Sequence, residues 1–235
     1  METKRRRNEA AYFLLLLTFV LAAASRPSLT ALLFLPVMFL HGFTIDKVLP
    51  RVLSRKLTAR DVLLLAINAV PYVYFFTPLV LIPATAFLLS IALSYARSNV
   101  LPQLMGTVGI SLLYLPLVQI FGGVRTIDLG VYIVWATYTL VEGIYVEYKL
   151  PYRKVTENQL RISWLSSLAL NAISVVISPL LVLPLIEPTI RFMKPGEKLS
   201  SPAQIRELGK RGTKRTLLVF ALLLAVILVY ELRLV

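Results

Sequence analysis

The chain has 235 residues, of which 57% are hydrophobic and 16% charged, and its mean hydropathy is +0.77. Soluble domains carry about a quarter charged residues, so this composition favours an all-α membrane protein over a water-soluble one. The chain contains no cysteine and one histidine, His41, which excludes disulfides, cysteine nucleophiles and histidine-rich metal sites. The net charge of +13 would suggest nucleic acid binding in a soluble protein. Here we expect no nucleic acid partner, because the positions of the cations matter more than their sum.

Nine apolar stretches follow one another along the chain, and each predicts a membrane-spanning helix. They are Ala10–Ala24, Leu29–Phe43, Val62–Phe76, Leu79–Tyr95, Leu101–Phe121, Leu129–Tyr148, Ile162–Ile177, Leu180–Met193 and Thr216–Tyr230. Proline beside a polar residue divides three regions too long for one ordinary span, at Arg26-Pro27, Thr77-Pro78 and Ser178-Pro179. We therefore expect a basic cytoplasmic arm at 1–9 and a single helical domain at 10–235, with a cytoplasmic loop at 194–215.

The distribution of lysine and arginine supports this count. With nine spans and a cytoplasmic N-terminus, 22 of the 25 Lys and Arg residues fall inside and 3 fall outside. Joining Ile162–Met193 into one span places the eight Lys and Arg residues of 191–215 outside and reduces this asymmetry. The charges thus favour a nine-span protein of the cell membrane with an external C-terminus. An alternative for the beginning is a cleaved signal peptide at 1–24, with Lys4–Arg7 before an apolar run and Ala22–Ala24 at the cleavage site.

Two basic segments are expected on the cytoplasmic side. The first lies between the second and third spans and contains Arg51, Arg55 and Lys56, which could bind an anionic phosphate or diphosphate head group. The alternative is that these cations only determine topology. The second segment, 191–215, is expected to lie along the inner leaflet near anionic lipids, or to bind a protein partner.

Several polar residues fall inside or beside the apolar stretches. An ionisable group at membrane depth is costly, so Glu142 and Glu187 are candidates for holding a proton, a cation or a polar substrate group. Glu142 is the stronger candidate, because the rest of its span is uncharged apart from Glu147 near the inner end. The alternative for both is a helix–helix contact, which is also our interpretation of Asn68, Gln119 and Asn171.

Aromatic residues such as Tyr74, Phe75, Phe76 and Tyr152 lie in or beside the expected spans. Belts of aromatic side chains are typical of membrane–water interfaces, and we interpret most of these residues in that way. The alternative is that some of them line a cavity for an isoprenoid tail.

Three segments together carry a family resemblance. The loop from Arg51 (RVLSRKLTARDVLLL) is similar to a segment that leads into a third membrane helix, and Tyr95-Ala-Arg97 with the glycines Gly106 and Gly109 is similar to the start of a fifth. Together with Trp135–Lys154, they resemble the UbiA-type intramembrane prenyltransferase superfamily. The tail Pro202–Gly209 (PAQIRELG) is similar to the YwiC-like group of membrane proteins.

The resemblance implies a nine-helix bundle that binds a prenyl diphosphate through Mg²⁺. It places Asp46, Glu142 and Glu147 on the metal side, and Arg51, Arg55, Lys56 and Arg97 on the phosphate side. The chain departs from the family in its acidic motifs, because Glu142 and Glu147 lie five residues apart, about 140° around a helix. We therefore expect binding or modification of an isoprenoid or other lipid, without ordinary magnesium-dependent prenyl transfer and with no catalytic residue assigned. The alternatives are a transporter, in which Glu142 or Glu187 couples protons, and a non-catalytic subunit of a membrane assembly.

Overall fold

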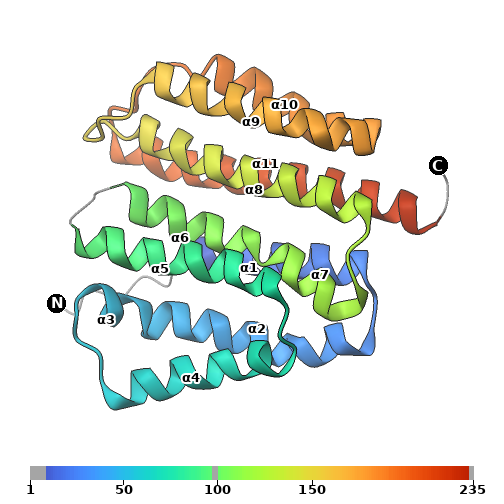
Figure 1. Cartoon of the computed structure of the whole chain (residues 1–235). Coiled ribbons are helices and arrows are strands. Elements are labelled where there is room, and N and C mark those ends of the chain that lie inside the picture. Colours follow the sequence, from blue (N-terminus) through green and yellow to red (C-terminus); the bar gives the residue numbers. More distant parts are fainter. Residues whose placement is uncertain (1–8, 97–99, 233–235) are drawn as a thin grey trace. The chain divides into compact units, whose positions relative to one another are not determined.

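A computed structural model describes residues 9–96 and 100–232 of the chain, and every regular element in these ranges is a helix (Figure 1). The predicted all-α class is therefore confirmed for the described residues. The chain divides into two compact units, Met1–Gly123 and Val124–Val235. Arg97 and the basic cluster Lys4–Arg7, both singled out in the sequence, lie outside the described residues.

Unit 1 consists of helices joined by short turns. They are α1 (Glu9–Ser25), α2 (Leu29–Lys47), α3 (Leu49–Leu53), α4 (Ala59–Tyr74), the 3₁₀ turn η1 (Pro78–Val80), α5 (Leu81–Tyr95), α6 (Leu101–Leu112) and α7 (Tyr114–Gly122). Helix α1 packs on α2, α6 and α7, while α5 packs along α6. The boundary between α6 and α7 falls just before Pro116, which has no N–H to offer the carbonyl of Leu112.

Unit 2 has four longer segments. They are α8 (Thr126–Lys149), α9 (Glu157–Ile177), the 3₁₀ turn η2 (Pro179–Val182) leading into α10 (Leu183–Met193), and α11 (Pro202–Glu231). Helix α9 packs along α8, and α10 contacts α8, α9 and α11. A capping box formed by Thr156 and Gln159 fixes the beginning of α9, since each side chain accepts a hydrogen bond from the other residue's backbone N–H.

Each of the nine predicted stretches lies largely within helical structure, and the chain turns at the three predicted polar–proline positions. Six helical segments are long and apolar enough to cross a membrane: Leu29–Val52, Pro78–Tyr95, Leu101–Gly122, Thr126–Lys149, Glu157–Ile177 and Pro202–Glu231. The other three, α1, α4 and α10, have 17, 16 and 11 residues. Length and composition therefore indicate an integral membrane protein with at least these six candidate spans.

Two expected loops are partly helical, which corrects the predicted boundaries. Residues 44–46, which follow the expected end of the second span at Phe43, belong to α2, which ends at Lys47. The expected loop 194–215 ends at Ser201, because α11 begins at Pro202. The start of α11 is fixed by a capping box between Ser201 and Gln204, with proline at the first helical position, where its missing N–H has no cost.

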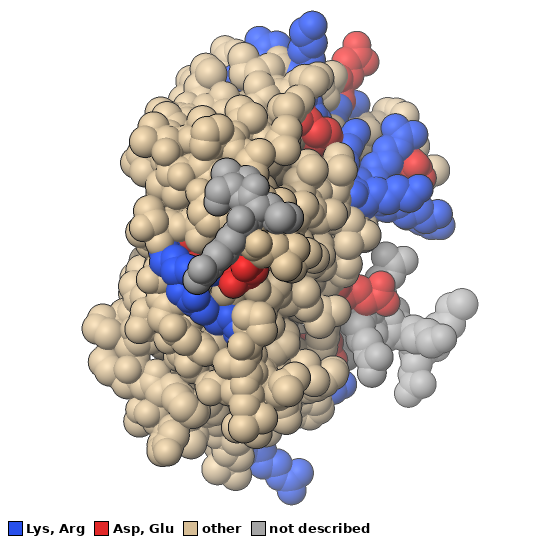
Figure 2. Space-filling model, turned by 90° about the vertical axis from the view of Figure 1, so that its right-hand side faces the viewer, with Lys and Arg blue, Asp and Glu red and all other residues tan. Residues whose placement is uncertain are grey.

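The surface of the helices is apolar, whereas several polar side chains are buried. Val176 is 87% exposed and Val73 73%, while Asn171 and Ser174 are fully buried. Most of the surface seen in Figure 2 is uncharged, and its Lys and Arg side chains gather in a few groups. This distribution is opposite to that of a water-soluble bundle and is typical of helices solvated by hydrocarbon.

The packing of α8 against η2 can be tested at a glycine. A methyl group added at Gly130 would lie 2.5 Å from Cδ1 of Leu181, a side chain that is fully buried. We expect Gly130→Ala to destabilise the protein by about 1–3 kcal/mol through overpacking. The matched control is Gly209→Ala in α11, where an added methyl group meets nothing within 4 Å.

The control should be neutral or stabilising by about 0.5–1 kcal/mol, because alanine favours the helix. Thermal unfolding of both variants in the same detergent measures the difference. Equal midpoints for the two variants would show that α8 and η2 do not pack as described.

Candidate functional site

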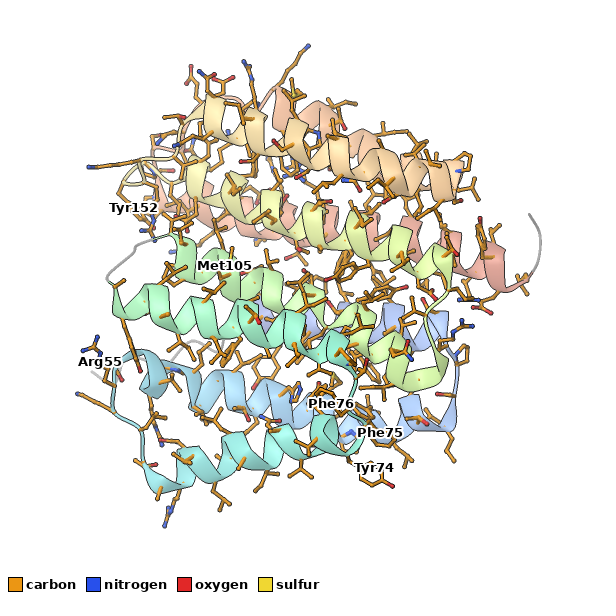
Figure 3. The ribbon with its side chains drawn as sticks, viewed as in Figure 1. Arg55, Tyr74, Phe75, Phe76, Met105 and Tyr152 are labelled. Carbon is orange, nitrogen blue, oxygen red and sulfur yellow. The ribbon has the colours of Figure 1, made fainter. Side chains whose placement is uncertain are left out.

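Loops and helix ends of unit 2 are tied together at one end of that unit. The hydroxyl of Tyr148 donates to the carbonyl of Gly196 at 2.6 Å, and Nζ of Lys149 donates to the carbonyl of Glu197 at 2.6 Å. Nε of Arg161 donates to the carbonyl of Met193 at 3.0 Å. Tyr152 marks this end in Figure 3. These bonds bring the end of α8, the start of α9 and the loop after α10 together, and we call this region the basic end of unit 2.

An ionic cluster lies beside the basic end. Nη1 of Arg191 on α10 lies 2.5 Å from Oε2 of Glu142 on α8, and its Nε donates to Oε1 of Glu187 at 3.0 Å. The same Glu187 oxygen lies 3.4 Å from Nε of Arg215 on α11. The side chains of Arg191 and Glu142 are only 6% and 14% exposed. Two glutamates and two arginines therefore balance one another, which makes charge at this depth tolerable.

Aromatic rings complete the surroundings of Arg191. The guanidinium carbon lies 4.8 Å from the ring centre of Tyr145 and 4.2 Å from that of Phe192. The hydroxyls of Tyr138 and Thr216 are 3.1 Å apart, which connects α8 to α11 next to the cluster. Stacking on aromatic faces and multiple donors make arginine well suited to such a partly dry ionic site.

A hollow of about 290 Å³ adjoins this cluster. Its lining combines α8, the loop before α11 and α11 itself: Tyr145, Lys149, Leu199, Gln204, Glu207, Leu208, Arg211 and Arg215. Three cations and one carboxylate line it, so the hollow is electropositive. Arginine and lysine donors around such a hollow can bind a phosphate or carboxylate group by charge-assisted hydrogen bonds.

The three carboxylates expected on the metal side have cationic partners. Glu147 lies 2.8 Å from Arg153, and Asp46, in unit 1, lies 3.5 Å from Lys47. Glu142 is held by Arg191. Among the described residues, no three Asp, Glu or His side chains gather closely enough to hold a metal ion. As arranged here, these carboxylates do not fit a Mg²⁺ site, which needs several converging, available oxygens.

The predicted phosphate-side residues of unit 1 have mainly structural contacts. Nη1 of Arg51 donates to Asp61 at 2.8 Å, which also caps α4. Hydrogen bonds from Thr58, together with Arg51, hold the pKa of Asp61 below its ordinary value, so this carboxylate stays charged. Arg55 lies over the ring of Tyr95 at 4.4 Å. Arg55 marks one end of unit 1 in Figure 3, and the next residue, Lys56, is exposed at the same end.

Unit 1 contains a polar chain that the sequence did not reveal. Nε2 of His41 lies 2.6 Å from the hydroxyl of Tyr72, and Nδ1 lies 2.6 Å from Oδ1 of Asn68. Asn68 donates to Thr44, which donates to the carbonyl of Leu40. The donors and acceptors match if His41 carries its proton on Nδ1. The spacing of these residues could have indicated the chain. His41 and Thr44 lie three residues apart on α2, and Asn68 and Tyr72 lie four apart on α4, so each pair shares one helix face.

The other amides differ in their surroundings. Asn171 is buried and donates to Thr137 at 2.8 Å, so it joins α9 to α8 as a helix–helix contact. Gln119 is exposed on α7. The cluster in unit 2 and the polar chain in unit 1 each join more than two polar side chains between helices.

No protein-family model matches the chain, and comparisons with curated proteins and with solved structures give no match. The candidate site therefore rests on its geometry, and the UbiA-type relationship remains a proposal.

The ionic cluster makes a prediction about stability. Arg191→Met removes the cation but leaves Glu142 in place, and we expect a loss of about 3 kcal/mol or more, because a buried charge then has no partner. Adding Glu142→Gln to Arg191→Met should recover part of the loss. The matched control, Glu157→Gln, breaks a partly exposed pair with Arg161 and should cost less than about 1 kcal/mol.

Unfolding in detergent, monitored by circular dichroism, compares the stability of wild type, the single variant, the double variant and the control. A single variant Arg191→Met as stable as the control would mean that the cluster does not hold α8 and α10 together.

Proposed function

We propose that this chain is a nine-span membrane protein with a cytoplasmic N-terminus, and that it binds a lipid through an anionic head group at the basic end of unit 2. The observation that carries the proposal is the hollow in which Lys149, Arg211 and Arg215 meet beside the ionic cluster. It lies where basic loops meet apolar helices, which is the depth of a lipid head group.

The helices that are shorter than an ordinary span still have nearly the length needed to cross the hydrocarbon core. At about 1.5 Å per residue, the 17 residues of α1 and the 16 of α4 extend for about 25 Å, against a hydrocarbon core of about 30 Å. The η2–α10 segment, 179–193, is shorter still at about 22 Å. A thinner bilayer accommodates such a segment.

The ends of the helices support the proposed orientation. In unit 1, the hydroxyl of Tyr95 donates to the carbonyl of Val52, so the end of α5 lies beside the basic segment 47–60. The opposite end of this unit is marked by Arg26, which donates to the carbonyl of Gly123. Unit 2 begins at the next residue, and its entry, Arg125, pairs with Glu231 away from its basic end. In each unit the basic segments therefore gather at one end, as the positive-inside rule predicts.

The lipid is proposed to be an isoprenoid or another lipid with a phosphate-containing head group. The electropositive lining supports an anionic head group, and the apolar helix surfaces leave its tail in the bilayer. Because the candidate carboxylates are paired with cations, we do not propose magnesium-dependent prenyl transfer. Proton transport through Glu142 or Glu187 is less well supported for the same reason, since both carboxylates are held by Arg191.

The natural absence of cysteine allows a direct test of topology. Single substitutions Ser28→Cys and Ser200→Cys place one thiol on each proposed side, before α2 and before α11. In intact cells we expect a membrane-impermeant maleimide to label position 28 and not position 200. Permeabilised cells are the control, in which both thiols should react. Labelling of position 200 in intact cells would rule out the proposed orientation.

Head-group binding can be tested by identifying retained lipids. We expect mass spectrometry of the purified protein to find a phosphate-containing lipid, and the double variant Lys149→Gln, Arg211→Gln to retain about tenfold less of it through the loss of two charge-assisted contacts. Lys154→Gln is the matched control, because Lys154 is exposed at the same end but does not line the hollow. Equal retention by the two variants would place the lipid elsewhere or leave the protein without one.

A further inference from the structure

Arg215 has a partner on the protein and also lines the hollow. Its Nε lies 3.4 Å from Oε1 of Glu187, and Arg215 lines the hollow together with Lys149 and Arg211. The Glu187 oxygen is shared, since Nε of Arg191 donates to it at 3.0 Å. If Arg215 turned away, Glu187 would still have one arginine partner.

The exposures of the two ion pairs differ in a useful way. Arg215 and Glu187 are 30% and 32% exposed, whereas Arg191 and Glu142 are 6% and 14% exposed. The pair of Arg215 and Glu187 is about one-third exposed and 3.4 Å apart, so it is weak and its opening costs little free energy. The buried pair is held from several sides and keeps its geometry. Arg215 is therefore the member of the cluster that can change partners.

A head group in the hollow competes with Glu187 for Arg215. A head group displaces Glu187 from Arg215 only to the extent that Arg215 interacts more strongly with the head group than with Glu187. A phosphodiester carries one negative charge, as Glu187 does, so exchanging one for the other gains little. A phosphomonoester carries about −1.5 to −2 at pH 7 and offers three acceptor oxygens. It therefore gains more from the exchange than a phosphodiester does.

The remaining charges of the hollow favour the same ligand. Arg211 donates to Glu207 at 2.9 Å, so this cation is also partly neutralised by the protein. Lys149 donates a hydrogen bond to the carbonyl of Glu197. Because a carbonyl is neutral, this contact does not compensate the charge of the lysine. Three cations and one carboxylate give the lining a formal charge of about +2, which a dianion balances.

We infer that Glu187 is a specificity-determining residue, which makes the hollow selective for lipids with a terminal phosphomonoester over lipids with a phosphodiester head group. This inference rests on the proposed function, because it requires that the hollow binds a lipid head group. Glu187 acts by holding Arg215, so that only the more highly charged head group takes this arginine from it.

The test compares two lipids with the same tails. Native mass spectrometry of the full-length protein, titrated with dioleoyl phosphatidic acid or dioleoyl phosphatidylglycerol, gives a dissociation constant for each. We expect wild type to prefer the phosphomonoester by about tenfold. Glu187→Gln should bind the phosphodiester more tightly and reduce the preference to about twofold, because Arg215 is then free. Glu157→Gln is the matched control, since Glu157 also pairs with an arginine four residues along its helix but lies outside the hollow.

Arg215→Gln provides a second variant that does not disturb the partner of Arg191. It should weaken binding of the phosphomonoester and leave binding of the phosphodiester nearly unchanged. A thermal unfolding midpoint for each variant identifies any loss of binding caused by misfolding.

The outcomes separate the two proposals. If wild type binds neither lipid, the proposed function fails. If it binds both equally, or if Glu187→Gln keeps the wild-type preference, the role of Glu187 is overturned while lipid binding stands. Displacement of phosphatidic acid by equimolar inorganic phosphate would assign the selectivity to free phosphate and overturn the lipid part of the inference.

Discussion

The structure depends on one constraint, which is that its helices have apolar outer surfaces and must hide their polar groups from hydrocarbon. Backbone N–H and C=O groups are bonded within the helices, and polar side chains on the helices often bond to carbonyls one turn back. Thr44 donates to Leu40 O, Thr137 to Ile133 O, and Ser167 to Ser163 O. In water such groups would be solvated, but in a bilayer each unsatisfied group costs several kcal/mol. The short turns and helix caps at the ends follow from the same requirement.

This constraint also accounts for two sets of polar side chains that contact one another between helices. In unit 1 the set is neutral, and His41 lies in the middle of a chain of hydrogen bonds between α2 and α4. In unit 2 the set is ionic, and Arg191 neutralises glutamates from α8 and from its own helix. The ionic set is the more costly one to maintain, and it lies next to the basic end, where a head group can take part in it. The candidate site in unit 2 therefore lies beside buried charge.

Much of the fold was predictable because apolar length and proline position depend on local sequence. The nine apolar stretches correspond to the helices, and the breaks at Arg26, Thr77 and Ser178 are present. The start of α11 was predicted wrongly, because a charged, capped helix beyond the apolar run resembles a loop when only hydropathy is considered. Ser201, Pro202 and Gln204 carried the signal for its beginning.

The site was less predictable, because its contacts join distant parts of the chain. Glu142 was identified as a candidate, but its partner Arg191 lies 49 residues later, and no periodicity connects them. Arg51 and Arg55 were singled out for their charge, whereas Asp61 and Tyr95 give them structural contacts. Lys149, Arg211 and Arg215 were predicted only as cations of the cytoplasmic side. Sequence thus indicated the residue types, and the packing of α8 against α11 determined which of them meet.

Trypsin digestion in sealed vesicles of opposite orientation tests the central claim most directly. Because the protease cleaves after Lys and Arg, it reads the side of the membrane on which these residues lie. In inside-out vesicles we predict rapid cleavage within 194–215 and 47–60, and in right-side-out vesicles little cleavage except after Arg125 and at Arg233, because Pro27 blocks cleavage after Arg26. Rapid cleavage within 194–215 in right-side-out vesicles, or equal digestion in both orientations, would contradict a bilayer-spanning chain with its cations on one side.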